Sequence, residues 1–540
     1  MTAATTGGGA ALRAPDAARD TGTVAALTLV SRLTGFVRIV AVAAVLGTTF
    51  LGNTYQTANT VPNIVFELVA AGVLTAVLLP SLVRLLDGPD PGEAEHVARS
   101  VLGIVGAALG ALAVLGIVLA PQLMGALLSA VPEGEGRVDQ VRVGTVLLRC
   151  FLPQLVLYAA GMVATAVLHA RGRFALPAIA PVLNNVVVTA TYAAFWLMTR
   201  DGGGGLDLSA AEQLVLGLGT TAGVVAFCAV PVVAVVRSGT SLWPRFDHRH
   251  PEVRRLGRLG GWAAVQLGST QLLLVVVLVL ANAVEGGVVA YQLAFTVFLL
   301  PHAVVALPVA TALYPALARC AAARDGSGFA TTTSDGLLAV LLLTAPAAAG
   351  LVALAGPLAE LLSLGEAAGG VSQIAGAIAG FGPGLLGYGA LVFLTSASYA
   401  AGNTRTPALV HLGVLLAGGA AMVVAAAVVD GAGRVAWLAA AHSGAHLLGA
   451  LVLVGPARAA AGRPHPAHLA RPIASTVASA AAAGVVMGTV AQVVDGGNRA
   501  SAALALVVAG SVGLVTYLAG QRLGGLRPGI VPALLRGRPA

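Results

Sequence analysis

The sequence predicts an all-α polytopic membrane protein with fourteen transmembrane helices, built as two six-helix lobes in a duplicated arrangement plus two extra C-terminal helices. Three observations predict this class. Of 540 residues, 57% are apolar and only 10% are charged, and the mean hydropathy is +0.90, which excludes an ordinary water-soluble domain. The apolar runs are continuous rather than alternating, which favours helices over strands. Finally, two passages recur along the chain.

Fourteen apolar stretches are long enough to cross a bilayer. Their many glycine and alanine residues suit close packing between neighbouring helices. The expected spans lie near residues 23–47, 55–84, 100–128, 143–168, 177–199, 211–236, 257–282, 288–317, 336–363, 371–398, 407–429, 434–455, 472–494 and 500–520.

The duplication rests on two pairs of similar passages. HARGRFALP at 169–177 matches YAAGNTRTP at 399–407, and PSLVR at 80–84 matches PALAR at 315–319. Chance similarity in a chain rich in alanine, glycine and leucine is the alternative. Transporters built from such repeats bind substrate between them. The predicted domains are an N-lobe at 23–236 (helices 1–6), a C-lobe at 257–455 (helices 7–12), and helices 13–14 at 456–520.

Arginine, the only basic residue type apart from histidine, sets the expected topology. Its excess in alternate loops predicts that both termini are cytoplasmic. The expected non-spanning parts are a disordered N-terminus at 1–22, a basic cytoplasmic linker at 237–256 and a cytoplasmic tail at 521–540. The net charge of +8 fits loops beside anionic lipid headgroups, so no nucleic-acid partner is expected.

The first predicted span carries two arginines, Arg32 and Arg38. Arginine at mid-bilayer depth costs on the order of 3 kcal/mol, and such residues usually face a partner or water. On a helical wheel, Ser31 lies in the same arc as both arginines. The two internal arginines also argue against a cleavable signal peptide.

The second predicted span carries a matching polar stripe. Its five residues fall within about 100° of one another on a helical wheel: Gln56, Asn59, Thr60, Asn63 and Glu67. We interpret the two helices as lining a solvated, net-positive cavity that binds phosphates, because the guanidinium fork can bind phosphate oxygens bidentately. Alternatively, Arg38 and Glu67 simply pair and hold the helices together.

Further polar residues are weaker candidates. Six on the seventh and eighth spans either line the cavity or make interhelical hydrogen bonds: Gln266, Ser269, Thr270, Gln271, Gln292 and Thr296. His442 and His446 are expected to be packing residues rather than metal ligands. The three scattered cysteines predict no disulfide framework. No nucleotide-binding or hydrolytic motif is found, so we expect no enzyme, no cofactor and no metal.

Several stretches resemble the MurJ/MviN family, the lipid II flippases of the multidrug/oligosaccharidyl-lipid/polysaccharide exporter superfamily. The resemblance covers nearly the whole chain. It is carried by Ser31–Arg38, Val61–Asn63 with Gly72 and Pro80, Leu168–Asn185, Leu300–Pro315 and Tyr399–Pro407.

The resemblance implies that the chain moves undecaprenyl-diphosphate-linked peptidoglycan precursor across the bacterial cytoplasmic membrane by alternating access, in cell-wall biosynthesis. Its implied partners are lipid II or a related polyprenyl-diphosphate lipid, membrane lipids and envelope-synthesis proteins. Ser31, Arg32 and Arg38 match the family's cationic cavity. The alternatives are an exporter of another lipid-linked polymer unit and a non-transporting membrane partner of envelope synthesis.

The chain also departs from the family pattern at charged positions. Acids usual after the second arginine, at the start of the second helix and before its glycine are replaced by Ile39, Asn53 and Ala71. Basic residues found in some members align with Phe66 and Thr296. The cavity is therefore expected to carry less charge than in family members that follow the pattern.

Overall fold

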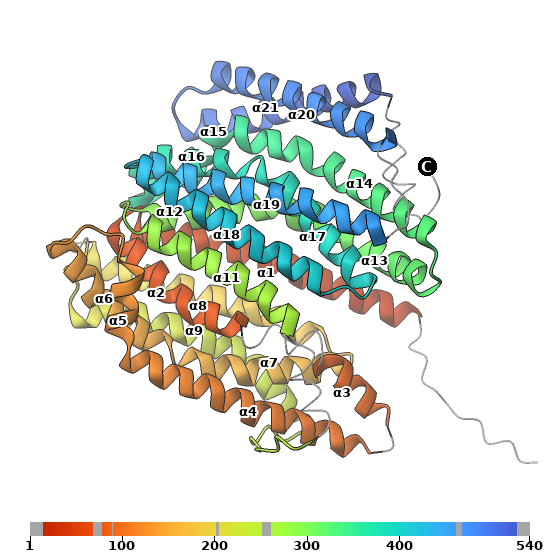
Figure 1. Ribbon diagram of the computed structural model, residues 1–540. Helices are drawn as coiled ribbons and strands as arrows, with labels where there is room; N and C mark the ends of the chain where they lie inside the picture. The colour runs from red at the N-terminus through yellow and green to blue at the C-terminus, as the bar shows by residue number, and fades with distance from the viewer. Residues whose placement is uncertain are drawn as a thin grey trace, which may run out of the picture.

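The computed structural model describes residues 14–68, 78–88, 90–200, 205–250, 261–460 and 467–525. Every regular element in these ranges is a helix, and the helices run roughly parallel or antiparallel in one elongated bundle (Figure 1). We refer to α1 through α9 as the N-lobe and to α11 through α19 as the C-lobe, and α20 and α21 pack outside the C-lobe (Figure 1).

The N-lobe consists of α1 (Ala14–Leu46), α2 (Phe50–Phe66), α3 (Leu79–Leu86), α4 (Pro91–Val118), α5 (Ala120–Leu127), α6 (Glu135–Phe151), α7 (Gln154–Ala170), α8 (Ala175–Thr199) and α9 (Ala210–Arg237). The C-lobe consists of α11 (Gly261–Ala281), α12 (Gly287–Pro301), the π-helical turn η3 (His302–Ala306), α13 (Leu307–Ala322), α14 (Gly326–Ala353), α15 (Ala355–Leu362), the 3-10 helix η4 (Gly365–Gly370), α16 (Val371–Phe381), α17 (Gly384–Ala400), α18 (Arg405–Val428) and α19 (Gly433–Ala460). The last two helices are α20 (Ala467–Val494) and α21 (Arg499–Leu523).

The all-helical membrane class is confirmed, whereas the count of fourteen spans is not. In the described residues, 12 helices are long and apolar enough to cross a membrane, and up to 13 if the bent pair Gly365–Phe381 and Gly384–Ala400 forms one span. The other expected span, at 55–84, runs through residues 69–77, which lie outside the described residues. The first helix begins at Ala14, earlier than the expected end of the disordered N-terminus at residue 22.

Each lobe has its own apolar core. Phe151 and Tyr192 are fully buried in the N-lobe, and Phe298, Phe381 and Phe393 are buried in the C-lobe. A third, smaller core joins α20 and α21 to α14. Each lobe therefore packs mainly around its own core, and Ala43 of α1 and Ile64 of α2 join the C-lobe core.

The two matching passages fold into the same local structure. In the turn after α7, Gly172 has a φ of +71° and the N–H of Arg173 donates to the Leu168 carbonyl over 2.8 Å. In the turn after α17, Gly402 has a φ of +76° and the N–H of Asn403 donates to Ser398 over 2.9 Å. Because a positive φ favours glycine, the shared glycine ends both helices in the same way. This agreement supports the predicted duplication.

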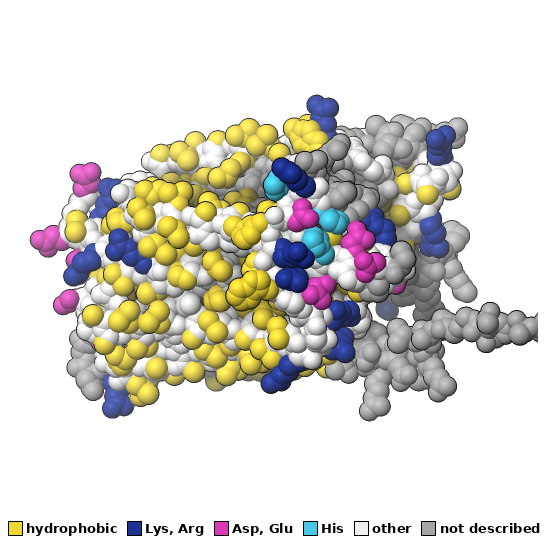
Figure 2. All heavy atoms as spheres, turned by 90° about the horizontal axis from the view of Figure 1, so that it is seen from below, with side chains coloured by type: hydrophobic (Ala, Val, Ile, Leu, Met, Phe, Trp, Pro, Cys, Tyr) yellow, Lys and Arg dark blue, Asp and Glu magenta, His cyan; other side chains and the backbone are white. Residues whose placement is uncertain are grey.

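The surface has the layout of a membrane protein. In Figure 2, charged side chains gather towards the two ends of the visible face, and hydrophobic side chains fill most of the area between them. On α4, Val114, Leu115 and Val118 are exposed. Such a contiguous apolar surface is stable only against lipid.

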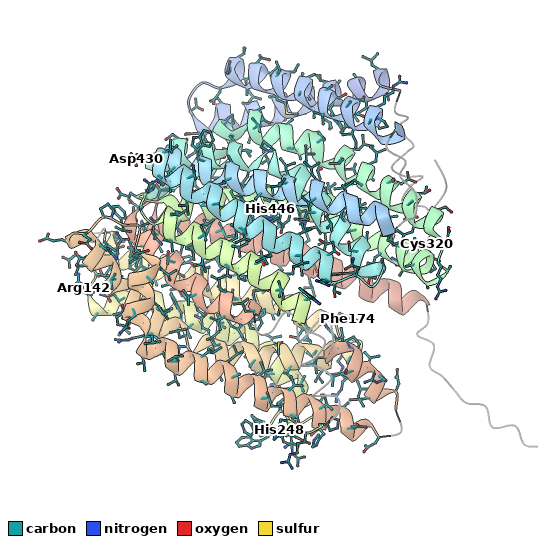
Figure 3. The ribbon with its side chains drawn as sticks, viewed as in Figure 1. Arg142, Phe174, His248, Cys320, Asp430 and His446 are labelled. Carbon is teal, nitrogen blue, oxygen red and sulfur yellow. The ribbon has the colours of Figure 1, made fainter. Side chains whose placement is uncertain are left out.

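Residues 238–250, which begin the predicted linker, dock against the start of α4. His96 donates to Asp247 over 3.0 Å, and the backbone N–H of Arg245 donates to the Arg99 carbonyl over 3.0 Å. His248 lies at the outer edge of this segment (Figure 3). Residues 251–260, which include the rest of the predicted linker, lie outside the described residues.

Candidate functional site

Arg38 lies on α1 beside a buried group of tyrosines. Its guanidinium is within electrostatic range of the phenols of Tyr55, Tyr158 and Tyr192, which come from α2, α7 and α8. Arg38 is half-buried, and its Nε has no hydrogen-bond partner. A buried guanidinium N–H without an acceptor is costly, so this position suits a ligand that supplies oxygen atoms.

The tyrosines are held by a hydrogen-bond network. The Tyr55 hydroxyl lies 2.9 Å from the Tyr192 hydroxyl and 2.7 Å from the Thr220 hydroxyl. Tyr158 donates to the Asn63 side-chain oxygen over 3.1 Å. This network fixes α2 against α7, α8 and α9, and therefore fixes the polar surroundings of Arg38. The sequence alone did not identify these tyrosines as part of the site, because they come from separate helices.

Arg32 is exposed on α1, in a helix whose neighbouring large side chains Leu29, Leu33 and Val37 are also exposed. Among the described residues, neither Arg32 nor Arg38 forms an ion pair, and no ion pair joins Arg38 to Glu67. Both arginines therefore have uncompensated positive charge inside a helix that is apolar enough to span a membrane.

The other predicted site residues lie at different depths. The Ser31 carbonyl accepts a hydrogen bond from Asn185 of α8 over 3.3 Å, so this residue helps to position α1. Gln56 is buried, Asn59 is half-buried and its carbonyl accepts from the Asn63 side chain over 2.9 Å, while Glu67 is exposed at the end of α2.

Two polar residues of α2 that lie outside the predicted stripe, Asn53 and Thr57, join the two lobes. Asn53 donates to the Val284 carbonyl over 2.7 Å and accepts from the Val288 N–H over 2.9 Å. Thr57 and Asn282 are hydrogen-bonded through their side chains. A side-chain amide supplies both a donor and an acceptor, whereas a carboxylate can only accept, which gives a physical reason for Asn53 where an acid is usual. Sequence reasoning placed the predicted stripe opposite the arginines and did not identify the interlobe contacts of Asn53 and Thr57.

Glycines allow close contact at the same end of the bundle. A Cβ on Gly286, whose φ is +68°, would lie 2.4 Å from Thr48, and one on Gly365 would lie 2.3 Å from the Ala44 carbonyl. With the Asn53 and Thr57 hydrogen bonds, these contacts form what we term the interlobe seal, where α1 ends and α2 begins.

The weaker candidates divide between the two predicted roles. Ser269, Thr270 and Gln271 line a cavity in the C-lobe. Gln266 accepts a hydrogen bond from Tyr399, and Gln292 donates to Thr60 across the lobes over 3.2 Å. The remaining candidate hydroxyl, that of Thr296, donates within its own helix to the Gln292 carbonyl over 2.8 Å.

His442 and His446 stack with ring centroids 4.1 Å apart and also line the C-lobe cavity. Within the described ranges, no group of three or more histidine, cysteine or acidic residues could hold a metal ion.

Comparison with known structures supports the fold. The structure titled "Lipid II flippase MurJ, inward closed conformation" superposes with a TM-score of 0.71 at 17% identity, covering 93% of this chain and 98% of that one. An inward-facing multidrug resistance transporter of the MATE family gives a TM-score of 0.62 at 13% identity, over 82% of this chain and 98% of that one. At these identities the likeness concerns the fold alone.

Comparison of sequences identifies the family. A protein of Rhizobium meliloti named "Probable lipid II flippase MurJ" is 28% identical over 73% of this chain and 72% of that protein. "Lipid II flippase MurJ" of Burkholderia cenocepacia is 27% identical over 73% of this chain and 75% of that protein. The profile of the family described as "Lipid II flippase MurJ" matches residues 42–507. The chain therefore belongs to the MurJ family of lipid II flippases.

Proposed function

We propose that this chain flips lipid II across the bacterial cytoplasmic membrane by alternating access, and that Arg38 and Arg32 hold the diphosphate during the movement. The observation that carries this proposal is the pair of arginines in α1, both without an acidic partner in the described residues. A diphosphate supplies the negative charge and the acceptor oxygens that this helix lacks.

The first step is recognition of the diphosphate. Arg38 presents its guanidinium beside the tyrosine network, and Arg32 lies about 1.7 turns further towards the N-terminus on the same helix. A diphosphate has two charged groups, so it can engage both arginines in succession or together. Asn63, fixed by Tyr158, would donate to a further phosphate oxygen, and Gln56 and Asn59 would supply polar surroundings.

The second step is the movement of the lobes. The distribution of arginine favours cytoplasmic termini, and with this orientation the interlobe seal would face the outer leaflet. In this conformation Asn53 and Thr57 hold that side closed. Breaking the seal and closing the opposite end would transfer the headgroup from one side to the other, while the polyprenyl tail stays in lipid.

We propose that Glu67 adjusts the charge at the end of α2 rather than neutralising Arg38, because no ion pair joins the two in the described residues. This chain lacks several acids usual in the family. Its arginines are therefore available to the substrate without first being released from an internal counter-ion.

The proposal is tested by flipping of fluorescent lipid II in vesicles containing the full-length protein. Arg38→Gln should reduce the affinity about 30–150-fold, because hydrogen bonds to a charged group contribute about 2–3 kcal/mol. Arg38→Lys keeps the charge but loses the fork, and should be intermediate. Arg142→Gln, at a surface arginine paired with Asp139, is the matched control. Unchanged flipping by Arg38→Gln would refute the site.

A further inference from the structure

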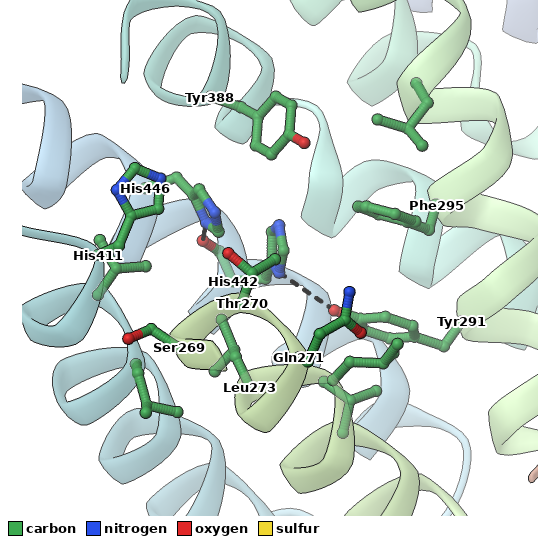
Figure 4. A pocket seen from close by; sticks show the side chains of 15 residues that line it. Ser269, Thr270, Gln271, Leu273, Tyr291, Phe295, Tyr388, His411, His442 and His446 are labelled. Carbon is green, nitrogen blue, oxygen red and sulfur yellow. Dashed lines mark hydrogen bonds between the residues drawn. The ribbon is translucent and has the colours of Figure 1, made fainter. Parts of the chain in front are cut away.

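A cavity of about 220 Å³ lies inside the C-lobe between α11, α12, α17, α18 and α19. Figure 4 shows three histidines at its wall, His411 from α18 and His442 and His446 from α19. Tyr291, Phe295 and Tyr388 supply aromatic walls, and Ser269, Thr270 and Gln271 supply polar groups. Three imidazoles around one cavity within a membrane-spanning bundle are a chemical feature that diphosphate binding does not explain.

Backbone carbonyls fix the proton positions of two of these rings. His446 Nδ1 lies 2.8 Å from the His442 carbonyl, and His411 Nδ1 lies 2.9 Å from the Pro407 carbonyl. A carbonyl oxygen can only accept, so Nδ1 carries the hydrogen in both neutral rings. In each ring Nε2 is then left with a free lone pair, which is the basic form of imidazole.

His442 is the most constrained of the three. It is only 8% exposed, and its Nδ1 lies 3.3 Å from the Tyr291 hydroxyl. Its Nε2 is buried without a hydrogen-bond partner. The ring stacks on His446 at a centroid distance of 4.1 Å and an interplanar angle of 25°. An unpartnered buried nitrogen beside a second basic ring is costly unless it binds something in another state.

The surroundings decide which charge state this conformation permits. The titratable groups facing the pair are Tyr291 on α12, Tyr388 on α17 and His411 on α18, with His302 of η3 against the far side of Tyr388 at 4.7 Å. α11 and α16 contain no titratable residue. α14 carries Asp335, which does not line the cavity. No carboxylate among the described lining residues can therefore compensate an imidazolium at this buried pair.

Two consequences follow from the stacking and the missing counter-charge. The pair can hold at most one proton, since two imidazolium rings at this distance repel strongly. A proton is also stable there only when water reaches the cavity, since burial penalises the charged form. Binding of a proton therefore favours a hydrated arrangement of α11, α18 and α19 over the arrangement in which both rings are buried.

We propose that His442 and His446 form a one-proton binding site whose protonation brings water to the two buried rings and so couples proton binding to movement of the C-lobe. The proton site itself stands on the geometry of the cavity, and its effect on transport rests on the proposed flipping function. A single site of this kind changes the balance of the two arrangements by at most about tenfold per pH unit.

The site is tested by nuclear magnetic resonance of the full-length protein in lipid nanodiscs, with histidine ring nitrogens labelled with ¹⁵N. The ring signals of His442 and His446 are identified by their absence in His442→Gln and His446→Gln. We expect them to convert from neutral to imidazolium form as the pH is lowered from about 8 to about 4, because burial penalises the charged ring, with a total change of one proton. His169→Gln, in the N-lobe, should leave this titration intact. Signals that stay neutral across the range, or two protons bound independently, would overturn the proposal.

Transport is measured separately in vesicles at two pH values. Wild-type flipping should change by up to about tenfold per pH unit, and the His442→Gln/His446→Gln variant should lose this dependence while still flipping. A pH dependence that persists in this variant would overturn the coupling. If the wild-type protein does not flip lipid II at any pH, the proposed function fails, whereas the ring titration still decides the proton site.

Discussion

Asn53 offers the sharpest test of the interlobe seal. Its side chain is fully buried, and it donates to the Val284 carbonyl over 2.7 Å while accepting from Val288 over 2.9 Å. The substitution Asn53→Asp keeps the size and the accepting oxygen but removes the donor. A carboxylate at this position would face the Val284 carbonyl, so one hydrogen bond would be replaced by repulsion between two acceptors.

The size of the expected change in the closed population follows from the burial of both partners in the Asn53–Val284 hydrogen bond. A buried carbonyl left without a donor costs about 1–3 kcal/mol, and about 1.4 kcal/mol changes an equilibrium tenfold. In the arrangement with separated lobes, both groups are hydrated and the cost disappears. Asn53→Asp should therefore lower the population with a closed seal by about tenfold to a hundredfold.

Spin labels on the two lobes measure this population directly. Arg142 and Asp430 lie at the same end of the bundle on opposite lobes (Figure 3), and both side chains are exposed. With cysteines at these two positions and the native cysteines removed, the short distance should dominate in the parent protein and a longer one in Asn53→Asp. Thr54→Val is the control, because Thr54 is equally buried but bonds only to Phe50 of its own helix. The same distance distribution in both variants would refute the seal.

Two further predictions concern the glycine contacts and the linker. Gly286→Ala should destabilise the closed seal by about 1–3 kcal/mol, because the added Cβ would clash with Thr48. Gly431→Ala is the control, since Gly431 has a similar positive φ but open space around it, and it should leave the label distance unchanged. Equal effects of the two substitutions would contradict the contact. The hydrogen bond from His96 lowers the pKa of Asp247 below its ordinary value, so linker docking is stabilised above the ordinary carboxyl pKa and this contribution is lost as pH falls through the lowered one. A spin label on the linker should gain mobility on acidification, and Asp247→Asn should abolish this dependence; a wild-type label insensitive to acid would contradict it.

The membrane class and most spans could be predicted because they depend on local composition. Long apolar runs define helices whatever their neighbours, and the glycine turns at Gly172 and Gly402 follow from the backbone conformation that those helix ends require. The matching passages at 169–177 and 399–407 therefore indicated a real similarity in local structure. Part of the expected span at 55–84, residues 69–77, lies outside the described residues.

The site could be predicted only in part because its contacts join distant helices. A helical wheel groups Arg32 with Arg38 and groups the α2 stripe, but it cannot say what each residue faces. Asn53 faces the C-lobe, and Tyr158 comes from α7 to hold Asn63. These pairings depend on how different helices pack together, which cannot be read from the periodicity of one helix.

Complementation measures the central role of the α1 arginines most directly. A bacterium depleted of its own lipid II flippase would be supplied with this chain, and outer-leaflet lipid II would be measured at matched membrane expression. The wild-type chain should restore outer-leaflet lipid II, Arg137→Gln/Arg142→Gln should restore it equally, and Arg32→Gln/Arg38→Gln should not. Restoration by Arg32→Gln/Arg38→Gln at the wild-type level would contradict diphosphate binding by these two residues.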